Sequence, residues 1–163
     1  MINRYTQKSL WLLVIALVIT IDQITKYYAV SYLSPYDSYQ IGSMLSFTLA
    51  YNTGAAFSFL VNTGLWHHWF LAIFSATVSL ILIILLIRMP SDDKLQAAAI
   101  SCIVGGALGN LYDRLFLGYV IDFIDVYYRN HHWPIFNLAD SFICIGAFLL
   151  LCKKNWNHNS IKL

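Results

Sequence analysis

The stretch Trp69–Ile87, WFLAIFSATVSLILIILLI, decides the fold class of this chain. It contains no ionisable residue, and apolar or small residues fill it from end to end. A helix needs about 20 consecutive apolar residues to cross roughly 30 Å of bilayer hydrocarbon. The stretch therefore predicts a membrane-spanning helix, which we place at residues 66–87.

Three further apolar stretches accompany it, at residues 10–33, 95–117 and 135–152. Of the 163 residues, 59% are hydrophobic and only 11% are charged, which is not the balance of a soluble domain of this size. The first stretch begins like a signal peptide, but no small-residue cleavage site follows it, so we expect a retained anchor. We therefore expect an all-α membrane protein with four transmembrane helices in a single domain, residues 1–163.

Lysine and arginine residues predict the orientation of these helices. The N-terminus, the loop Arg88–Lys94 and the C-terminus together carry seven of them, whereas the other two connections hold only Arg129. Positive residues concentrate on the cytoplasmic side of membrane proteins, so we expect both termini in the cytoplasm. Segments 34–65 and 118–134 would then lie on the outer side.

The outer segment 34–65 has its own pattern. Polar and apolar residues alternate in Leu45–Leu49, and turn residues interrupt the segment at Gly42 and Asn52–Gly54. Such alternation is typical of short strands joined by turns. Because the segment is also rich in aromatic residues, we expect a small β-rich region that lies on the membrane surface.

Ionisable residues inside a membrane are costly, so each one indicates a functional site by default. In the expected topology, polar residues of three spans and of the second outer segment share one depth, near the outer face. They are Asp22, Lys26, Asn110, Asp113, Arg114, Asp122, Asn137 and Asp140. Scattered structural residues would not collect in one layer, so we expect these side chains to form one site.

Some of these residues also have a structural interpretation. Asp22 and Lys26 are four residues apart, so they can neutralise one another on one helix face. Arg114 can pair with Asp113 as a structural clamp. The small-xxx-small spacing in Gly105–Gly109 favours close packing of this helix on a neighbour.

Asp122 and Asp140 differ, because neither has a cation three or four residues away. Two carboxyl groups that meet in a semi-apolar site cannot both ionise easily, so one keeps a proton and the pair supplies an acid and a base. The alternative interpretation is two unrelated aspartates at the membrane interface. Asp125, three residues after Asp122, is the other candidate for such a pair.

Other catalytic schemes find less support in the sequence. The adjacent pairs His67–His68 and His131–His132 lack a third ligand at metal spacing, so we expect interfacial residues and no metal site. There is no G-x-S-x-G motif for a serine nucleophile. Cys102, Cys144 and Cys152 fall in apolar stretches, where we expect buried packing residues. We therefore expect no metal and no cofactor.

Five motifs, in order, resemble those of the bacterial lipoprotein signal peptidase (signal peptidase II) family, and the resemblance covers nearly the whole chain. They are Asp22–Lys26 (DQITK), Asn52–Phe57 (NTGAAF), Gly105–Arg114 (GGALGNLYDR), Val120–Ile124 (VIDFI) and Phe136–Asp140 (FNLAD). This family removes the signal peptide of a prolipoprotein just before a cysteine that already carries diacylglycerol.

The resemblance implies an aspartic endopeptidase of the bacterial inner membrane with its site towards the periplasm. It implies that Asp122 and Asp140 are the catalytic dyad. The residues that would hold the substrate, orient the dyad or support the site are Asp22, Lys26, Asn52, Gly54, Asn110, Asp113, Arg114 and Asn137. The expected partners are a lipid-modified prolipoprotein and membrane phospholipids, without nucleic acid, and we expect a monomer. Segment 34–65 could close over the substrate as a lid.

Two functions of other classes stay open from the sequence. A transporter or proton-translocating protein could use the membrane aspartates as a relay. It should then carry polar groups across the full membrane depth, yet the cytoplasmic halves of 66–87 and 135–152 are almost bare. A non-catalytic assembly factor for envelope proteins would not need two unpaired carboxylates.

Overall fold

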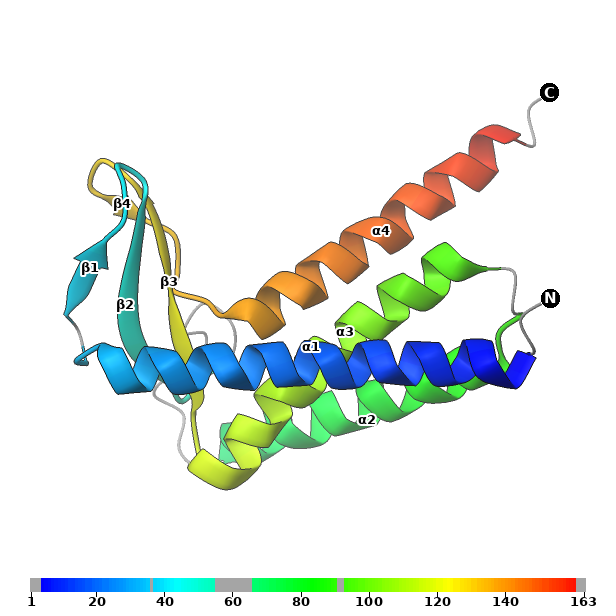
Figure 1. Cartoon of the computed structure of the whole chain (residues 1–163), viewed down its shortest axis with the longest axis horizontal. Helices are drawn as coiled ribbons and strands as arrows, with labels where there is room; N and C mark the ends of the chain where they lie inside the picture. Colours follow the sequence, from blue (N-terminus) through cyan, green and yellow to red (C-terminus); the bar gives the residue numbers. More distant parts are fainter. Residues whose placement is uncertain (1–3, 36, 55–65, 91–92, 161–163) are drawn as a thin grey trace.

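A computed structural model of the chain describes residues 4–35, 37–54, 66–90 and 93–160, and Figure 1 shows their arrangement. The helices are α1 (Arg4–Tyr32), α2 (Trp66–Arg88), α3 (Lys94–Leu117) and α4 (Leu138–Ser160). The strands are β1 (Ser38–Gln40), β2 (Leu45–Asn52), β3 (Val120–Tyr128) and β4 (His131–His132). The chain is thus mostly helical with a small sheet.

Three helices are long and apolar enough to cross a membrane, by length and composition, within the described ranges. They are the parts Gln7–Tyr32, His68–Arg88 and Lys94–Leu117 of α1, α2 and α3. Large apolar side chains such as Leu13, Phe74 and Leu80 are exposed on their surfaces. Such surfaces suit contact with lipid.

Helix α4 starts later than the hydropathy of the sequence suggests. It begins at Leu138 instead of Ile135, because Phe136 is still paired with β3. Ile124 donates its backbone N–H to the Phe136 carbonyl at 2.8 Å, and Phe136 donates to the Ile124 carbonyl at 3.1 Å. At its other end α4 continues to Ser160, beyond the expected end at Cys152.

Helix α3 contacts each of the other three helices. Its glycines make these contacts close. A Cβ atom on Gly105 would lie 2.6 Å from Cβ of Val18 in α1, and one on Gly109 would lie 2.6 Å from Oδ2 of Asp22. Both distances are too short for a side chain, so the close packing that the small-xxx-small spacing predicts is confirmed.

Side chains and backbone groups define both ends of α3. Asp93 accepts a hydrogen bond from the backbone N–H of Gln96 at 3.3 Å, as an N-cap residue does. Gly118 ends the helix in the left-handed conformation, with φ of +85°, and donates its N–H to the Arg114 carbonyl at 3.2 Å. This turn leads directly into β3.

The strands form one antiparallel sheet in the order β1-β2-β3-β4. The β-rich region expected in segment 34–65 is present in its described part, whereas residues 55–65 lie outside the described ranges. The expected lid therefore stays a prediction. β3, in the segment 118–134, was not expected as a strand. It pairs with β2 so that Ala50 lies opposite Asp122.

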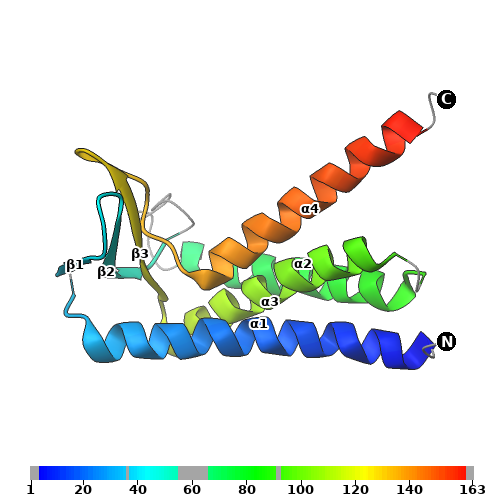
Figure 2. The ribbon, with the colours of Figure 1, turned by 45° about the horizontal axis from the view of Figure 1, so that its top comes forward.

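The sheet lies at one end of the helices, and the start of α1 and the end of α4 lie at the other (Figures 1 and 2). The cysteines are all free, but Cys144 and Cys152 are exposed on α4 and Cys102 is only partly buried. The expectation that all three are buried packing residues is therefore wrong. The apolar stretch that contains Cys144 and Cys152 presents these side chains outward.

Candidate active site

Polar side chains from α1, α3, α4, β2 and β3 form one connected network where the sheet meets the helices. Its members are Asp22, Gln23, Lys26, Asn52, Asn110, Asp113, Asp122, Asn137 and Asp140, joined by hydrogen bonds and ion pairs. Residues that lie far apart in the sequence thus meet in one layer of the molecule.

Asp122 lies in β3, and 3% of its surface is exposed. Asn52 of β2 donates its side-chain amide to Oδ2 of Asp122 at 2.9 Å, and Asn137 donates to Oδ1 at 2.7 Å. Burial, followed by the negative charge of Asp140, raises the pKa of Asp122 from 3.8 to about 7. The two amide hydrogen bonds lower this pKa but do not outweigh burial.

Asp140 lies in the first turn of α4, where the helix start fixes its side chain. The backbone N–H of Asp140 donates to Oδ1 of Asn137 at 2.9 Å, and the backbone N–H of Asn137 donates back to Oδ2 of Asp140 at 3.3 Å. This reciprocal arrangement is a capping box with aspartate at the third helical position. Asn110 of α3 donates to Oδ1 of Asp140 at 2.8 Å.

Asn137 connects the two aspartates. Its side chain is fully buried, and the nitrogen of its amide contacts Asp122 while the oxygen contacts the backbone of Asp140. The same nitrogen donates to Oδ1 of Asn110 at 3.1 Å. The spacing Asn137-x-x-Asp140 is the sequence signal of the capping box, and it locates the start of α4 better than hydropathy does.

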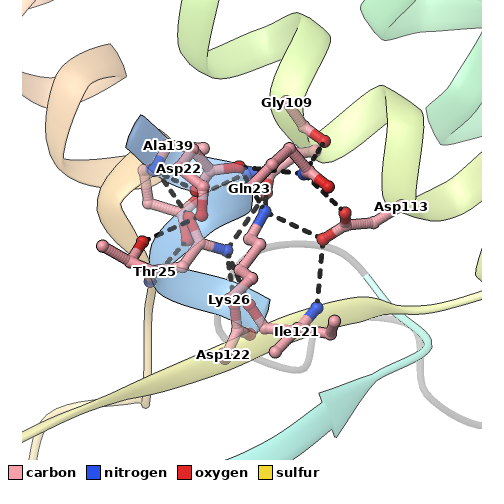
Figure 3. Close-up of polar contacts among 12 residues, drawn as sticks. Asp22, Gln23, Thr25, Lys26, Gly109, Asp113, Ile121, Asp122 and Ala139 are labelled. Carbon is pink, nitrogen blue, oxygen red and sulfur yellow. Dashed lines mark hydrogen bonds and ion pairs between the residues drawn. The ribbon is translucent and has the colours of Figure 1, made fainter. Parts of the chain in front are cut away.

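Lys26 of α1 lies between two aspartates, as Figure 3 shows. Its Nζ lies 2.7 Å from Oδ2 of Asp22 and 2.8 Å from Oδ2 of Asp113, and only 1% of the residue is exposed. The predicted pair of Asp22 and Lys26 is confirmed. The expected clamp of Asp113 with Arg114 is not an ion pair in the structure. Asp113 forms its ion pair with Lys26, which reaches it from the neighbouring helix, and interacts with Arg114 only electrostatically.

The two aspartates beside Lys26 also hold the backbone next to the catalytic candidates (Figure 3). Asp22 accepts the backbone N–H of Ala139 at 2.9 Å, one residue before Asp140. Asp113 accepts the backbone N–H of Ile121 at 3.3 Å, one residue before Asp122. Through these two carboxylates, one lysine positions both α4 and β3.

Arg114 and Gly54 contact the network at its edges. Arg114 donates to the Asn110 carbonyl at 3.3 Å, and its guanidinium interacts electrostatically with Asp140 and Asp122. The backbone N–H of Gly54 donates to Oδ1 of Asn52 at 2.9 Å, which is an Asx-type turn. Gly54 therefore fixes the side-chain amide that faces Asp122.

Gln23 belongs to the network but was not among the residues expected to form the site. It donates to Oδ1 of Asp113 at 2.8 Å and to the Gly109 carbonyl at 3.3 Å, so it joins α1 to α3 (Figure 3). The available signal was its place in an apolar span directly beside Asp22, since a buried amide there needs partners.

Asp125, the other candidate for the pair, has different partners. It is buried, and it accepts a hydrogen bond from Ser46 at 3.1 Å and contacts Nδ1 of His132 at 2.9 Å. These residues lie on β2 and β4, in a separate cluster of the sheet. The geometry thus links Asp122, rather than Asp125, to Asp140.

The arrangement suits acid–base chemistry on a water molecule. The buried carboxyl group of Asp122 and the partly buried one of Asp140 share a bridging amide, and the raised pKa of Asp122 keeps a proton on the pair close to neutral pH. Within the described residues, no group of three or more histidine, cysteine and acidic side chains could hold a metal ion.

Comparison with known proteins gives consistent results along the chain. Residues 14–155 match the family model of signal peptidase (SPase) II. A lipoprotein signal peptidase of Teredinibacter turnerae is 50% identical over 141 residues, which cover 86% of this chain and 84% of the relative. One of Acinetobacter baylyi is 49% identical over 147 residues, covering 90% and 82%.

Two solved structures, both described as bacterial membrane enzymes, have the same fold. One superimposes with a TM-score of 0.82 at 31% identity and covers 95% of this chain and 92% of its own. The other has a TM-score of 0.78 at 33% identity, with coverage of 89% and 92%.

Proposed function

The chain belongs to the signal peptidase (SPase) II family and is therefore a peptidase that acts on prolipoproteins at the membrane, and from this premise we propose that Asp122 and Asp140 are its catalytic pair. In this proposal the enzyme is an aspartic endopeptidase. It cuts a diacylglyceryl-modified prolipoprotein just before the lipidated cysteine.

One observation carries the assignment of the pair. Asn137 hydrogen-bonds to the carboxylate of Asp122 at 2.7 Å and to the backbone of Asp140 at 2.9 Å, so a single buried side chain holds the two residues together. Away from bulk water, the repulsion between two carboxylates is screened less, so it is harder for both groups to be ionised at once. This is the environment in which one carboxyl group stays protonated and its neighbour is ionised.

The reaction proceeds by addition and elimination. The ionised carboxylate takes a proton from a water molecule while the water oxygen forms a bond to the scissile carbonyl carbon. The protonated carboxyl group gives its proton to the carbonyl oxygen. In the second step the C–N bond breaks, and the leaving nitrogen receives the proton that the first carboxylate took from water. As the carbonyl re-forms, the second carboxylate takes back a proton from a hydroxyl group of the intermediate, so the pair returns to its starting state.

The proposed location follows from the substrate. The diacylglyceryl chains of a prolipoprotein lie in the outer leaflet, so the scissile bond must meet the pair at the outer surface of the inner membrane. We place the sheet on the periplasmic side, both termini in the cytoplasm, and α4 as the fourth transmembrane helix. The enzyme works as a monomer surrounded by phospholipid, and it uses no cofactor.

The test is the cleavage rate of four purified variants on a lipidated prolipoprotein. Asp122→Asn and Asp140→Asn keep shape and polarity but cannot exchange a proton with water. Each should lower turnover by about 10²–10⁴-fold, and the double variant should be little worse than either single one. Substrate binding, measured separately, should change much less.

Asp125→Asn is the matched control. It makes the same charge change three residues away, and its oxygen can still accept a hydrogen bond from Ser46, so turnover should stay close to that of the unchanged enzyme. Near-normal turnover in either single variant of the pair, or loss of turnover in the control alone, would show that the assignment is wrong.

A further inference from the structure

The last two turns of α1 show where the membrane surface meets the protein. Tyr27, Tyr28 and Tyr32 are exposed there, and the rings of Tyr28 and Tyr32 stack with their centroids 6.1 Å apart. Tyrosine and tryptophan collect at the level of the lipid headgroups, where the ring lies in an apolar layer and its polar atom reaches water. The end of α1 at Tyr32 therefore marks the headgroup level on the sheet side of the molecule.

The turn between β3 and β4 lies at the same level but away from the helices. In Figures 1 and 2 this turn is level with the sheet-side end of α1 along the helix direction, and it projects sideways, away from α1, α2 and α3. A segment in this position would stand over the lipid that surrounds the helices. We call residues Val126–Trp133 the hairpin tip.

One face of the hairpin tip is occupied by contacts within the sheet. His132 Nδ1 lies 2.9 Å from Oδ1 of Asp125, and Ser46 donates its hydroxyl to Oδ2 of the same carboxylate at 3.1 Å. The ring of Tyr127 stacks on His132 with centroids 5.1 Å apart, and its hydroxyl donates to the Gly42 carbonyl at 3.0 Å. These contacts hold the hairpin tip in place on the sheet.

The opposite face of the hairpin tip is apolar and exposed. Successive side chains of a strand point to opposite faces, so Val126 and Tyr128, on either side of Tyr127, lie on the other face. Trp133 follows His132 and lies on that face as well. Val126, Tyr128 and Trp133 are 40%, 57% and 58% exposed. Single exposed apolar residues are ordinary, whereas a group of them on one face indicates a binding surface.

The turn itself adds a positive charge beside this apolar face. The guanidinium of Arg129 lies 5.4 Å from the centre of the Tyr128 ring. Arg129 is also the only lysine or arginine in residues 34–65 and 118–134. A guanidinium binds phosphate oxygens through paired hydrogen bonds. An arginine next to exposed aromatic rings, at headgroup level, therefore matches a phospholipid in both charge and polarity.

We propose that the hairpin tip is a second membrane-binding surface, outside the spanning helices, whose partner is the phospholipid headgroup layer at the sheet end of the molecule. Tyr128 and Trp133 lie in this layer, and Arg129 binds lipid phosphate, most strongly where anionic lipid is present. The inference goes beyond the proposed function and does not depend on the catalytic pair. It implies that the sheet, and with it Asp122 on β3, is held at a fixed level relative to the lipid surface.

The depth of a spin label at the hairpin tip tests this inference without any substrate. The three cysteines are replaced by alanine, a nitroxide is attached to Asn130→Cys, and the enzyme is placed in nanodiscs of phosphatidylcholine with or without phosphatidylglycerol. Collisions with oxygen, which concentrates in lipid, are compared with collisions with a water-soluble nickel chelate. The label should be shielded from nickel and accessible to oxygen, and more so in the discs that contain phosphatidylglycerol.

A label on the other face of the sheet is the control for position. Gln40 is exposed on β1 and pairs with Ser46, which in turn pairs with Asp125, so it shares the polar face of the sheet. A nitroxide on Gln40→Cys should collide mainly with nickel in both kinds of disc.

Three variants of the labelled enzyme assign the contact to its residues. Tyr128→Ser combined with Trp133→Ser should move the Asn130→Cys label into water in both kinds of disc. Arg129→Gln should remove only the difference between the two kinds. Tyr39→Ser removes another exposed tyrosine of the sheet, on β1, so it is the matched control and should leave the label in place.

A label at position 130 that collides mainly with nickel, with the rest of the hairpin tip unchanged, would overturn the proposal. Shielding that appears only when a lipidated prolipoprotein is added would do the same, because the partner would then be the substrate. Equal shielding in the two kinds of disc would contradict the role given to Arg129. None of these measurements involves cleavage, so their failure is distinct from failure of the proposed function, which would appear as normal cleavage by Asp122→Asn.

Discussion

At the scale of single residues, the raised pKa of Asp122 predicts how cleavage depends on pH. The rise to about 7 comes from burial first and from the charge of Asp140 second, so it describes the loss of the last proton of the pair. Because the proposed mechanism needs one proton on the pair, the cleavage rate at saturating substrate should fall as pH rises through about 7. The slope should approach about tenfold per pH unit.

The same pKa has a consequence for stability, with a definite sign. The folded-state pKa lies above the value of 3.8 of a free carboxyl group, so between about pH 4 and pH 7 the folded protein binds more protons than the unfolded one. This group therefore destabilises the fold progressively as pH rises across that window.

A cleavage rate that rises steadily from pH 6 to pH 8 would contradict the raised pKa.

Contacts between site residues could be predicted from the sequence only where the two residues are close in the sequence and their spacing places them on one helix face. The four-residue spacing of Asp22 and Lys26 predicts their ion pair, which the structure contains at 2.7 Å. The contact of Lys26 with Asp113 joins residues 87 positions apart in different helices, and no periodicity in the sequence predicts it. Local spacing favoured Arg114 as the partner of Asp113 instead, and tertiary packing overrode it.

At the scale of elements, the glycines of α3 set how closely α4 can approach. A Cβ atom on Gly106 would collide with the carbonyl oxygen of Ala139, which is a backbone atom and cannot rotate away. Gly106→Ala should therefore push the first turn of α4 away from α3, at a cost of about 1–3 kcal/mol in stability. Because Asp140 follows Ala139 directly, turnover should fall more than substrate binding.

Gly42→Ala provides the matched control for this prediction. Nothing lies within 4 Å of a Cβ atom at Gly42, in the turn between β1 and β2, so this variant should keep both turnover and melting temperature. Turnover and thermal unfolding in detergent are measured for both variants. Equal behaviour of the two would show that close packing of α3 on α4 does not position Asp140.

The element that the sequence did not predict is β3, and its burial explains why. The alternation that identifies β2 depends on one face being exposed, whereas the first four residues of β3, Val120–Phe123, are all buried. Its partner β2 lies about 70 residues earlier, as the hydrogen bond between Asn52 and Asp122 illustrates. The apolar setting of Asp122 was visible in the sequence, but the strand that creates it was not.

At the scale of the whole molecule, polar and apolar residues are separated in the way that a membrane requires. Most of the buried charged and amide side chains belong to the network where the sheet meets the helices, while large apolar side chains remain exposed along α1 and α2. In a soluble protein the opposite distribution would be expected. The sequence predicts this distribution well, because hydropathy is a local property that needs no knowledge of packing.

The orientation of the molecule in the membrane gives the last prediction. In a variant with Cys102, Cys144 and Cys152 replaced by alanine, a single cysteine is introduced either as Ser43→Cys or as Lys94→Cys. Both positions are exposed, Ser43 near the turn of the sheet and Lys94 at the opposite end of the helices, at the start of α3 (Figure 2). If positive residues lie on the cytoplasmic side, a thiol reagent that cannot cross the inner membrane should label only Ser43→Cys in intact cells. Both should react after lysis, which controls for accessibility.

Labelling of Lys94→Cys alone in intact cells would reverse the orientation, and labelling of both would contradict a protein that separates these two ends by a bilayer. Only the predicted orientation brings Asp122 and Asp140 to the outer leaflet, where the proposed substrate carries its diacylglyceryl group and the bond that they are proposed to cleave.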